Sequence, residues 1–191
     1  MPRLPMIITG AAIVLALLHP SAAGACEPDS PPDATLRITV DNVIGALYIN
    51  GTPVEVGPET SVNWTLTDTV SFPVQPGENV LAVKAVDQGV IAGLLAELRV
   101  GDSALVSSEA WRGHHDAPAG WEQPAFDDSG WSAATPYGTH PGGVWGTRVQ
   151  GMDGSNATWI WNQVNIQDGE VEPTVYFRFT FQVKPGWLAS P

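Results

Sequence analysis

Cysteine and basic residues are both scarce in this chain of 191 residues, and each shortage excludes a class of protein. The single cysteine, Cys26, has no partner within the chain, so the sequence is not that of a disulfide-stabilised scaffold. The 8 lysines and arginines are outnumbered by 20 aspartates and glutamates, which gives a formal net charge of −12. Nucleic acid and anionic lipid are bound through clustered basic residues, so neither is a predicted partner.

Helical periodicity is also missing, and long apolar runs are confined to the N-terminus. No stretch of a dozen residues repeats apolar side chains at helical spacing, which argues against a helical bundle. The apolar run from Met6 to Leu18 follows Arg3 and precedes a group of small residues. This is the pattern of a secretory signal peptide, and the run is too short to cross a bilayer as a helix. We therefore expect residues 1–25 to be a signal peptide, with no transmembrane segment after them.

The position of the cysteine, directly after Ala23-Gly24-Ala25, leaves two interpretations open. Signal peptidase cleaves after such A-x-A sites, which would give a secreted protein beginning at Cys26. The segment also resembles a bacterial lipobox, in which the cysteine is lipidated and anchors an envelope lipoprotein, although Ala23 is smaller than the residue usual in that motif. Both interpretations predict a bacterial protein that is either secreted or held in the cell envelope.

The chain has 20 glycines and 17 prolines, and its 8 tryptophans are unusually many against 3 tyrosines. Glycine and proline together are fewer than in low-complexity chains, and their number suits many short strands joined by turns. Residues 27–33, EPDSPPD, are acidic and rich in proline, a composition typical of a stiff, solvated linker. We assign residues 26–35 to such a tether.

Alternating apolar and polar residues after the tether predict β-strands. The clearest examples are residues 36–40 and 174–183, while Asn50-Gly51 is a strong hairpin signal. The continuous apolar segment 80–86 predicts a central strand covered on both faces. We expect an all-β fold, a single antiparallel sandwich over residues 36–183, followed by a short tail over residues 184–191.

Four segments, in this order, resemble the galactose-binding-like jelly-roll family. They are TVDNVIGALYING at residues 39–51, QPGENVLAV at 75–83, WEQPAFDDSGW at 121–131 and YFR at 176–178. Their spacing is similar to that in the accessory β-sandwich domains of α-L-rhamnosidases and β-galactosidases. The resemblance implies a jelly-roll sandwich that accompanies catalysis in those enzymes and stands alone here. We therefore expect a non-catalytic carbohydrate-binding module rather than an enzyme, with a glycan or polysaccharide as its partner.

Tryptophans in and beside a loop-rich crossover over residues 113–170 indicate where a sugar would bind. Sugar rings stack their C–H faces on aromatic rings, while carboxylates, imidazoles and guanidinium groups bind the hydroxyls. We expect an aromatic platform and a polar rim made by Trp111, Trp121, Trp145, His115, Asp116 and Arg148. Core positions are expected for Trp131 and Trp159, and a core position is the alternative for each platform tryptophan.

Two clusters of polar residues contain side chains that could catalyse glycoside hydrolysis or bind a metal ion, but both fit a structural role better. The adjacent carboxylates of Asp127 and Asp128 point apart on an extended backbone, whereas a glycosidase needs two carboxylates facing one sugar. They predict a turn, with Trp131 filling the core behind it. The sequence His114-His115-Asp116 lacks the spacing of a zinc site, so we predict no metal site. No cofactor is predicted either, and the spacing of acidic residues does not support a structural calcium ion.

A second function remains open, that of a structural or adhesive envelope protein that contacts another protein through the sandwich. The two hypotheses differ in the surface that they require. A sugar site calls for a cleft with a polar rim, whereas a protein contact calls for a contiguous exposed apolar patch.

Overall fold

The computed structural model describes residues 33–162 and 173–187. All of them belong to one unit that spans residues 31–191. The predicted signal peptide, the predicted lipidation site at Cys26 and most of the predicted tether lie outside the described residues. Within the described residues, no helix is both long enough and apolar enough to cross a membrane.

Twelve β-strands and three short 3₁₀ helices make up the regular structure of the described residues. The strands are β1 (Asp33–Asp41), β2 (Val43–Ile49), β3 (Thr52–Pro53), β4 (Asp68–Pro73), β5 (Gly77–Val86), β6 (Gly93–Val100), β7 (Ser103–Val106), β8 (Arg112–His114), β9 (Ser132–Ala133), β10 (Thr135–Thr139), β11 (Thr158–Trp161) and β12 (Thr174–Val183). The 3₁₀ helices are η1 (Thr60–Val62), η2 (Gly143–Trp145) and η3 (Pro185–Trp187). The first strand begins at Asp33, three residues before the predicted start of the domain.

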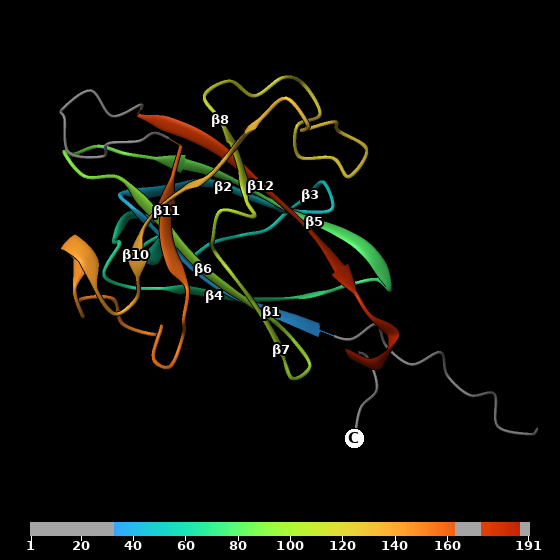
Figure 1. Ribbon diagram of the computed structural model, residues 1–191, viewed down its shortest axis with the longest axis horizontal. Helices are drawn as coiled ribbons and strands as arrows, with labels where there is room; N and C mark the ends of the chain where they lie inside the picture. The colour runs from blue at the N-terminus through green and yellow to red at the C-terminus, as the bar shows by residue number, and fades with distance from the viewer. Residues whose placement is uncertain (1–32, 163–172, 188–191) are drawn as a thin grey trace, which may run out of the picture. The chain divides into compact units, whose positions relative to one another are not determined.

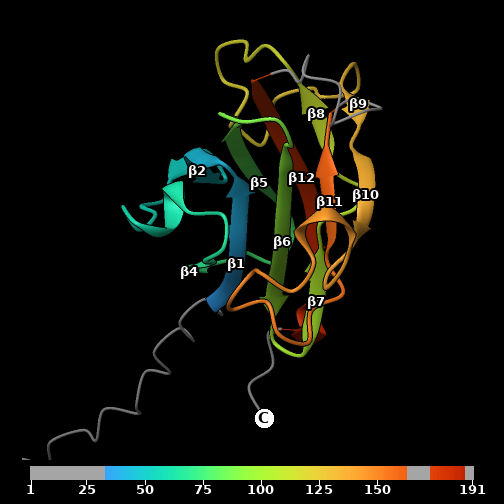
Figure 2. The ribbon, with the colours of Figure 1, turned by 90° about the vertical axis from the view of Figure 1, so that its left-hand side faces the viewer.

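The strands form two antiparallel sheets of six strands each (Figure 1). The order in the first sheet is β10-β11-β6-β1-β4, with β7 also paired to β6, and the order in the second is β3-β2-β5-β12-β8-β9. Figure 2 looks onto the first sheet, with β1, β6 and β11 side by side in front and β5 and β12 behind. This arrangement confirms the predicted all-β class and the single sandwich.

The core between the sheets follows from the alternating pattern, most clearly in β12. Five side chains on one face of this strand are at most 8% exposed, namely Val175, Phe177, Phe179, Phe181 and Val183. The strand pairs with β5 along its whole length, from Thr174 opposite Val86 to Val183 opposite Gly77. Burying large apolar side chains stabilises the fold by about 1.5–3 kcal/mol each, which holds β12 in the sheet. The predicted pairing of residues 174–183 is confirmed.

The described part of the crossover is more regular than the loop-rich segment that the sequence predicts. It contains β9, β10, β11 and most of β8, which add two strands to each sheet. These strands are two to five residues long and lie among glycines and prolines. Such short strands show too few alternations to be recognised from sequence.

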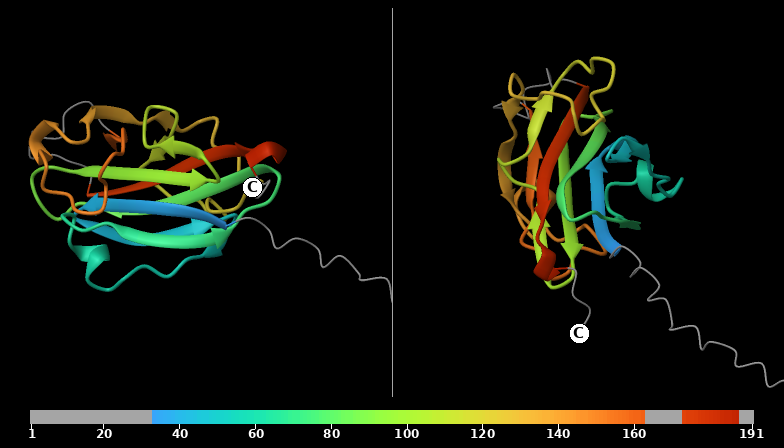
Figure 3. Two further views of the ribbon diagram at one scale, coloured as in Figure 1. Left: turned by 90° about the horizontal axis from the view of Figure 1, so that it is seen from below. Right: turned by 90° about the vertical axis from the view of Figure 1, so that its right-hand side faces the viewer.

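The segment between β3 and β4, which contains η1, projects from the side of the sandwich (Figure 3). Hydrogen bonds join it to the loop between η2 and β11, because Gln150 N–H donates to Thr65 O at 2.8 Å and Thr67 N–H donates to Gln150 O at 3.2 Å. Thr39 Oγ1–H of β1 also donates to Trp64 O at 3.0 Å. These two segments thereby become neighbours at one end of the first sheet.

Candidate functional site

The three tryptophans of the predicted platform lie in the interior. Trp111 and Trp145 are 1% exposed and Trp121 is 8% exposed. Trp111 stacks on Phe179 with ring centroids 5.2 Å apart and planes 3° from parallel. These rings present no free face on which a sugar could stack, which corrects the expectation of an exposed platform. The core positions predicted for Trp131 and Trp159 are confirmed, at 7% and 0% exposure.

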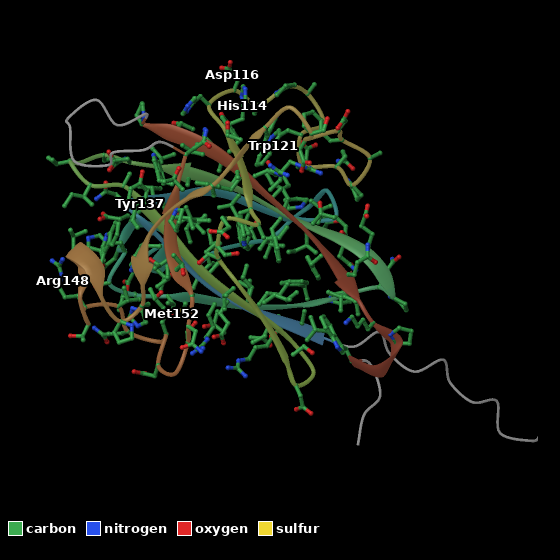
Figure 4. The ribbon with its side chains drawn as sticks, in the orientation of Figure 1. His114, Asp116, Trp121, Tyr137, Arg148 and Met152 are labelled. Atoms are coloured by element: carbon green, nitrogen blue, oxygen red, sulfur yellow. The ribbon has the colours of Figure 1, made fainter. Side chains whose placement is uncertain are left out.

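The polar residues predicted for the site are divided between two places. His115 and Asp116 are exposed in the loop after β8, and Figure 4 shows Asp116 at the top of the view with Arg148 at the far left. Asp116 N–H donates to His114 Nδ1 at 3.0 Å, and the His114 ring stacks on Trp131 with centroids 5.5 Å apart. The fold therefore does not bring His115 and Asp116 to Arg148. Among residues 33–162 and 173–187, no group of three or more histidine, cysteine, aspartate or glutamate side chains is placed to hold a metal ion.

A second hydrophobic cluster covers the outer face of the second sheet. This outer-face cluster consists of Ala82, Trp121 and Trp131, with Tyr48, Ala117, Phe126 and Tyr176 packed against it. The rings of Trp121 and Trp131 stack with centroids 6.4 Å apart above the small side chain of Ala82 in β5. The other face of β5 packs into the main core, so this strand is covered on both faces as its sequence predicts.

Arg178 holds the loop of residues 121–128 against the outer-face cluster through hydrogen bonds. Its side chain, 1% exposed, extends from β12, and Nε–H donates to Asp128 Oδ2 at 2.8 Å. The guanidinium also donates to the carbonyl oxygens of Trp121, Gln123 and Phe126. Every one of these contacts is internal, so Arg178 is a structural residue, and its role was not visible in the sequence.

The predicted turn at the adjacent carboxylates is confirmed. Asp127 Oδ1 accepts a hydrogen bond from Ser129 N–H at 3.0 Å, while Asp128 pairs with Arg178. Trp131 N–H donates to Asp128 O at 2.9 Å, and the indole of Trp131 is buried behind the turn. These contacts direct both carboxylates to partners within the protein.

A pocket of about 240 Å³ lies at the end of β1. The connection between β3 and β4, the connection between β5 and β6, and the segment from η2 to Arg148 meet there. It is lined by Asp41, Asn42, Trp64, Gly89, Val90, Ile91, Val144, Trp145 and Arg148. Two of these residues, Trp145 and Arg148, belong to the predicted site. The other lining residues were missed, although Asp41 and Asn42 lie within the first segment that resembles the jelly-roll family.

Asp41 places a carboxylate in the lining of this pocket. It is the last residue of β1, lies opposite Gly93 of β6 and is 7% exposed. Trp145 Nε1–H donates to Asp41 Oδ2 at 2.9 Å, and no described residue donates to Oδ1. Burial raises the pKa of Asp41, the Trp145 hydrogen bond lowers it, the Asp87 carboxylate raises it and Arg148 lowers it, with a net rise above the ordinary value. The pocket thus contains a fixed carboxylate with one oxygen available to a ligand.

A stacked pair of tryptophans supports Asp41 from behind. The rings of Trp145 and Trp159 lie 4.2 Å apart between centroids, with planes 14° from parallel. They pack over Gly93, where an added Cβ would come within 2.7 Å of both rings. Glycine at this position leaves the space that allows Trp145 to reach Asp41.

Arg148 and Trp64 form another part of the lining. The guanidinium carbon of Arg148 lies 4.7 Å from the centroid of the half-buried Trp64 ring, a cation–π contact. Arg148 Nε–H donates to Trp145 O at 3.0 Å, and Nη2–H donates to Val144 O. These contacts fix the guanidinium in place, while its remaining N–H groups can donate to a ligand.

A charge cluster around the buried Glu97 secures the loop that carries Arg148 to the first sheet. Glu97 of β6 is 2% exposed and accepts hydrogen bonds from Arg37 at 2.6 Å and Arg99 at 2.7 Å. Burial raises the pKa of Glu97, but hydrogen bonds from Ser155, Arg37 and Arg99 more than offset this and hold it below the ordinary value. Arg37 Nη1–H also donates to Gly151 O at 2.8 Å, which ties the loop to β1.

Comparison with known proteins gives one informative match. An α-L-rhamnosidase from Streptomyces avermitilis is 34% identical to this chain over 130 residues. The match covers 62% of this chain and 12% of the length of that protein, so the chain is similar to a small region of a much longer glycosidase. No protein-family model and no solved structure matches the chain.

Proposed function

We propose that this protein is a non-catalytic carbohydrate-binding domain of the galactose-binding-like jelly-roll type, and that its ligand occupies the pocket lined by Asp41, Trp64 and Arg148. The observation that carries the proposal is the convergence of a hydrogen-bond acceptor, a donor and an apolar wall in one small pocket. Sugars present hydroxyl groups and apolar C–H faces, which such a lining satisfies. The similarity to a region of an α-L-rhamnosidase supports an accessory role beside sugar chemistry.

The number of carboxyl groups in the pocket favours binding without catalysis. Most glycosidases cleave with a pair of carboxyl groups that flank the scissile bond. Of the residues that line the pocket, Asp41 alone carries a carboxyl group. Its Oδ2 is committed to Trp145, so Asp41 is suited to accepting a hydroxyl hydrogen bond from a bound sugar.

Titration of intrinsic tryptophan fluorescence with a glycan panel that includes L-rhamnose-containing polysaccharides tests this function. We expect the wild-type chain to bind at least one glycan, and Asp41→Asn and Arg148→Met to abolish or strongly reduce binding. Asparagine keeps an oxygen that can accept from Trp145 Nε1–H, so Asp41→Asn preserves the fold while it removes the charge. His115→Ala and Asp116→Ala are the matched controls outside the pocket. A folded wild-type chain that binds no glycan would contradict the proposal.

We also propose that the domain acts outside the cytoplasm, either secreted or held in the bacterial envelope through a lipid on Cys26. The signal-like sequence of residues 1–25 and the cysteine that follows it support this proposal. Expression in a bacterium with labelled palmitate distinguishes the two forms. Anchoring predicts label in the wild-type chain and none in Cys26→Ser, whereas secretion predicts unlabelled protein in the medium.

The structural or adhesive alternative has less support. It requires a broad apolar surface, yet among the described residues three large hydrophobic side chains are exposed: Val62, Val90 and Val144, at 60%, 65% and 40%. Two of these three line the pocket, so the ligand site accounts for them better than a protein interface does.

A further inference from the structure

A row of three hydrogen-bond donors crosses the outer face of the second sheet, beside the outer-face cluster. Lys84 of β5 lies opposite Tyr176 of β12, and Tyr176 lies opposite His114 of β8, which is labelled near the top of Figure 4. Residues directly opposite each other on antiparallel strands have Cα atoms about 4.5–5.5 Å apart, and their side chains share a face. All three side chains are half-buried, so this donor row is open to solvent.

The outer-face cluster holds the two rings of the donor row in place. Tyr176 meets Trp121 edge-on with ring centroids 5.0 Å apart, and His114 stacks on Trp131. Because His114 Nδ1 accepts the hydrogen bond from Asp116 N–H, the proton of the neutral imidazole is on Nε2. His114 Nε2–H and the Tyr176 hydroxyl are therefore donors on rings that are already ordered before a ligand arrives.

Lys84 supplies the positive charge of the donor row. Its stem lies over Gly45 of β2, where an added Cβ would come within 3.2 Å of the Lys84 Cδ atom. The ammonium nitrogen lies 5.9 Å from the centroid of the Tyr176 ring, at the outer limit of a cation–π contact. None of the ion pairs among residues 33–162 and 173–187 involves Lys84. The charge is thus positioned by the sheet without a carboxylate among those residues to neutralise it.

The charge of the protein limits which anion suits this row. With a formal net charge of −12, the chain repels a polyanion or a multiply charged group more strongly than a single negative charge. One ammonium group matches one negative charge, and the two oxygens of a carboxylate can accept hydrogen bonds from neighbouring donors.

We propose that the donor row of Lys84, Tyr176 and His114 is a second binding site, which takes the carboxylate of an acidic sugar. The anion site itself does not depend on the pocket at the end of β1, because none of the three residues lines that pocket. That the carboxylate is carried by a sugar rests on the proposed function.

NMR titration of the full-length chain with glucuronate, and with glucose as the uncharged counterpart, tests the site. We expect glucuronate to shift the amide signals of Lys84, Tyr176 and His114, and glucose to leave them unchanged. The affinity for glucuronate should fall when NaCl is raised from about 0.02 M to about 0.2 M, because salt screens charges at an exposed site.

Three variants remove one donor each and keep the packing. Lys84→Met keeps a stem over Gly45, Tyr176→Phe keeps the ring against Trp121, and His114→Phe keeps a ring on Trp131. Lys84→Met should weaken glucuronate binding about fivefold or more, and the two ring variants should weaken it less.

Lys184→Met is the matched control for Lys84→Met. Lys184 also lies over an aromatic ring, with its ammonium nitrogen 5.6 Å from the centroid of Trp187, but it follows the far end of β12. This variant should bind glucuronate as the wild type does.

The outcomes separate this site from the proposed function. Absence of shifts in the donor row, an equal response to glucose, or unchanged affinity in Lys84→Met overturns the second site and leaves the pocket untouched. Glucuronate binding that is lost in Arg148→Met but retained in Lys84→Met assigns the anion to the pocket and also overturns it. Tighter binding of glucose 6-sulfate than of glucuronate overturns the assignment to a carboxylate. Glucuronate binding that persists in Asp41→Asn supports two independent sites, even where no neutral glycan binds.

Discussion

The outer-face cluster and the pocket contain the same kinds of residue, tryptophans beside an arginine and an aspartate, yet they differ in what those residues do. At the outer-face cluster, Arg178 is 1% exposed and donates to Asp128 and three carbonyl oxygens. At the pocket, the exposed Arg148 contacts two carbonyls of its own loop and still lines open space beside Asp41. The pocket differs from the outer-face cluster in the polar groups that the protein leaves available, and composition alone does not show which groups these are.

The largest expected effect on stability comes from removing β12, which carries part of the outer-face cluster and lines no part of the pocket. Deletion of residues 174–191 takes away β12, and with it Arg178 and the five buried side chains of its inner face. We expect the truncated chain not to fold, because β5 and the facing core would be exposed to water. Circular dichroism and thermal unfolding check this. A truncated chain that melts like the full-length protein would show that β12 is dispensable.

Substituting methionine for each arginine compares the two regions directly. Arg178→Met leaves the Asp128 carboxylate and three carbonyl groups without their partner, and should lower the free energy of unfolding by about 3–5 kcal/mol. Arg148→Met, at an exposed position, should change it by less than about 1 kcal/mol. Urea denaturation of the two variants measures both values. Similar losses would mean that the two arginines do not differ in the way their burial indicates.

The pH dependence of stability should have opposite signs at Glu97 and Asp41. The pKa of Glu97 is lowered on folding, so its contribution is present above about pH 4.5 and is lost as the pH falls through the lowered value. The pKa of Asp41 is raised, so its ionised form costs stability at neutral pH and protonation removes the cost.

Two isosteric variants test these signs by urea denaturation between pH 7 and pH 3. Glu97→Gln should be less stable than the wild type at pH 7 and should lose less stability on acidification. Asp41→Asn should be as stable as the wild type or more stable at pH 7. A destabilised Asp41→Asn would indicate that the carboxylate stabilises the fold, and would remove the contrast between the two sites.

The smallest effect is expected in the loop after β8. His115 and Asp116 are exposed, and the contact that orders their loop uses the backbone N–H of Asp116. Alanine at either position should change the free energy of unfolding by no more than about 0.5 kcal/mol and leave binding in the pocket unaltered. A loss of glycan affinity in either variant would show that this loop contributes to glycan binding, as the sequence predicted.

The long strands could be predicted from the sequence because their pattern is local. The alternation over residues 174–183 and the apolar run over residues 80–86 each indicate one strand and its covered faces without any knowledge of the neighbours. The short strands β8 to β11 were missed, because they are defined by their pairing with other strands of the sheets and not by a local pattern.

The site was only partly predictable because it depends on distant contacts. Trp145 and Arg148 were selected for their chemistry, and both line the pocket. Asp41 was not selected, because its hydrogen bond to Trp145 joins residues 104 positions apart. The burial of Trp111 and Trp121 likewise depends on which segments fold over them, which the local sequence does not encode.

The stacked indoles behind Asp41 give the protein an optical signal of its own. Two aromatic chromophores whose centroids lie 4.2 Å apart, with planes 14° from parallel, couple their electronic transitions and absorb as a pair. Trp145 is at once half of this exciton pair and part of the pocket lining. A ligand that shifts it alters the coupling, so the near-ultraviolet circular dichroism of the unlabelled protein reports on the pocket while the buried Trp111 and Trp161 supply a constant background.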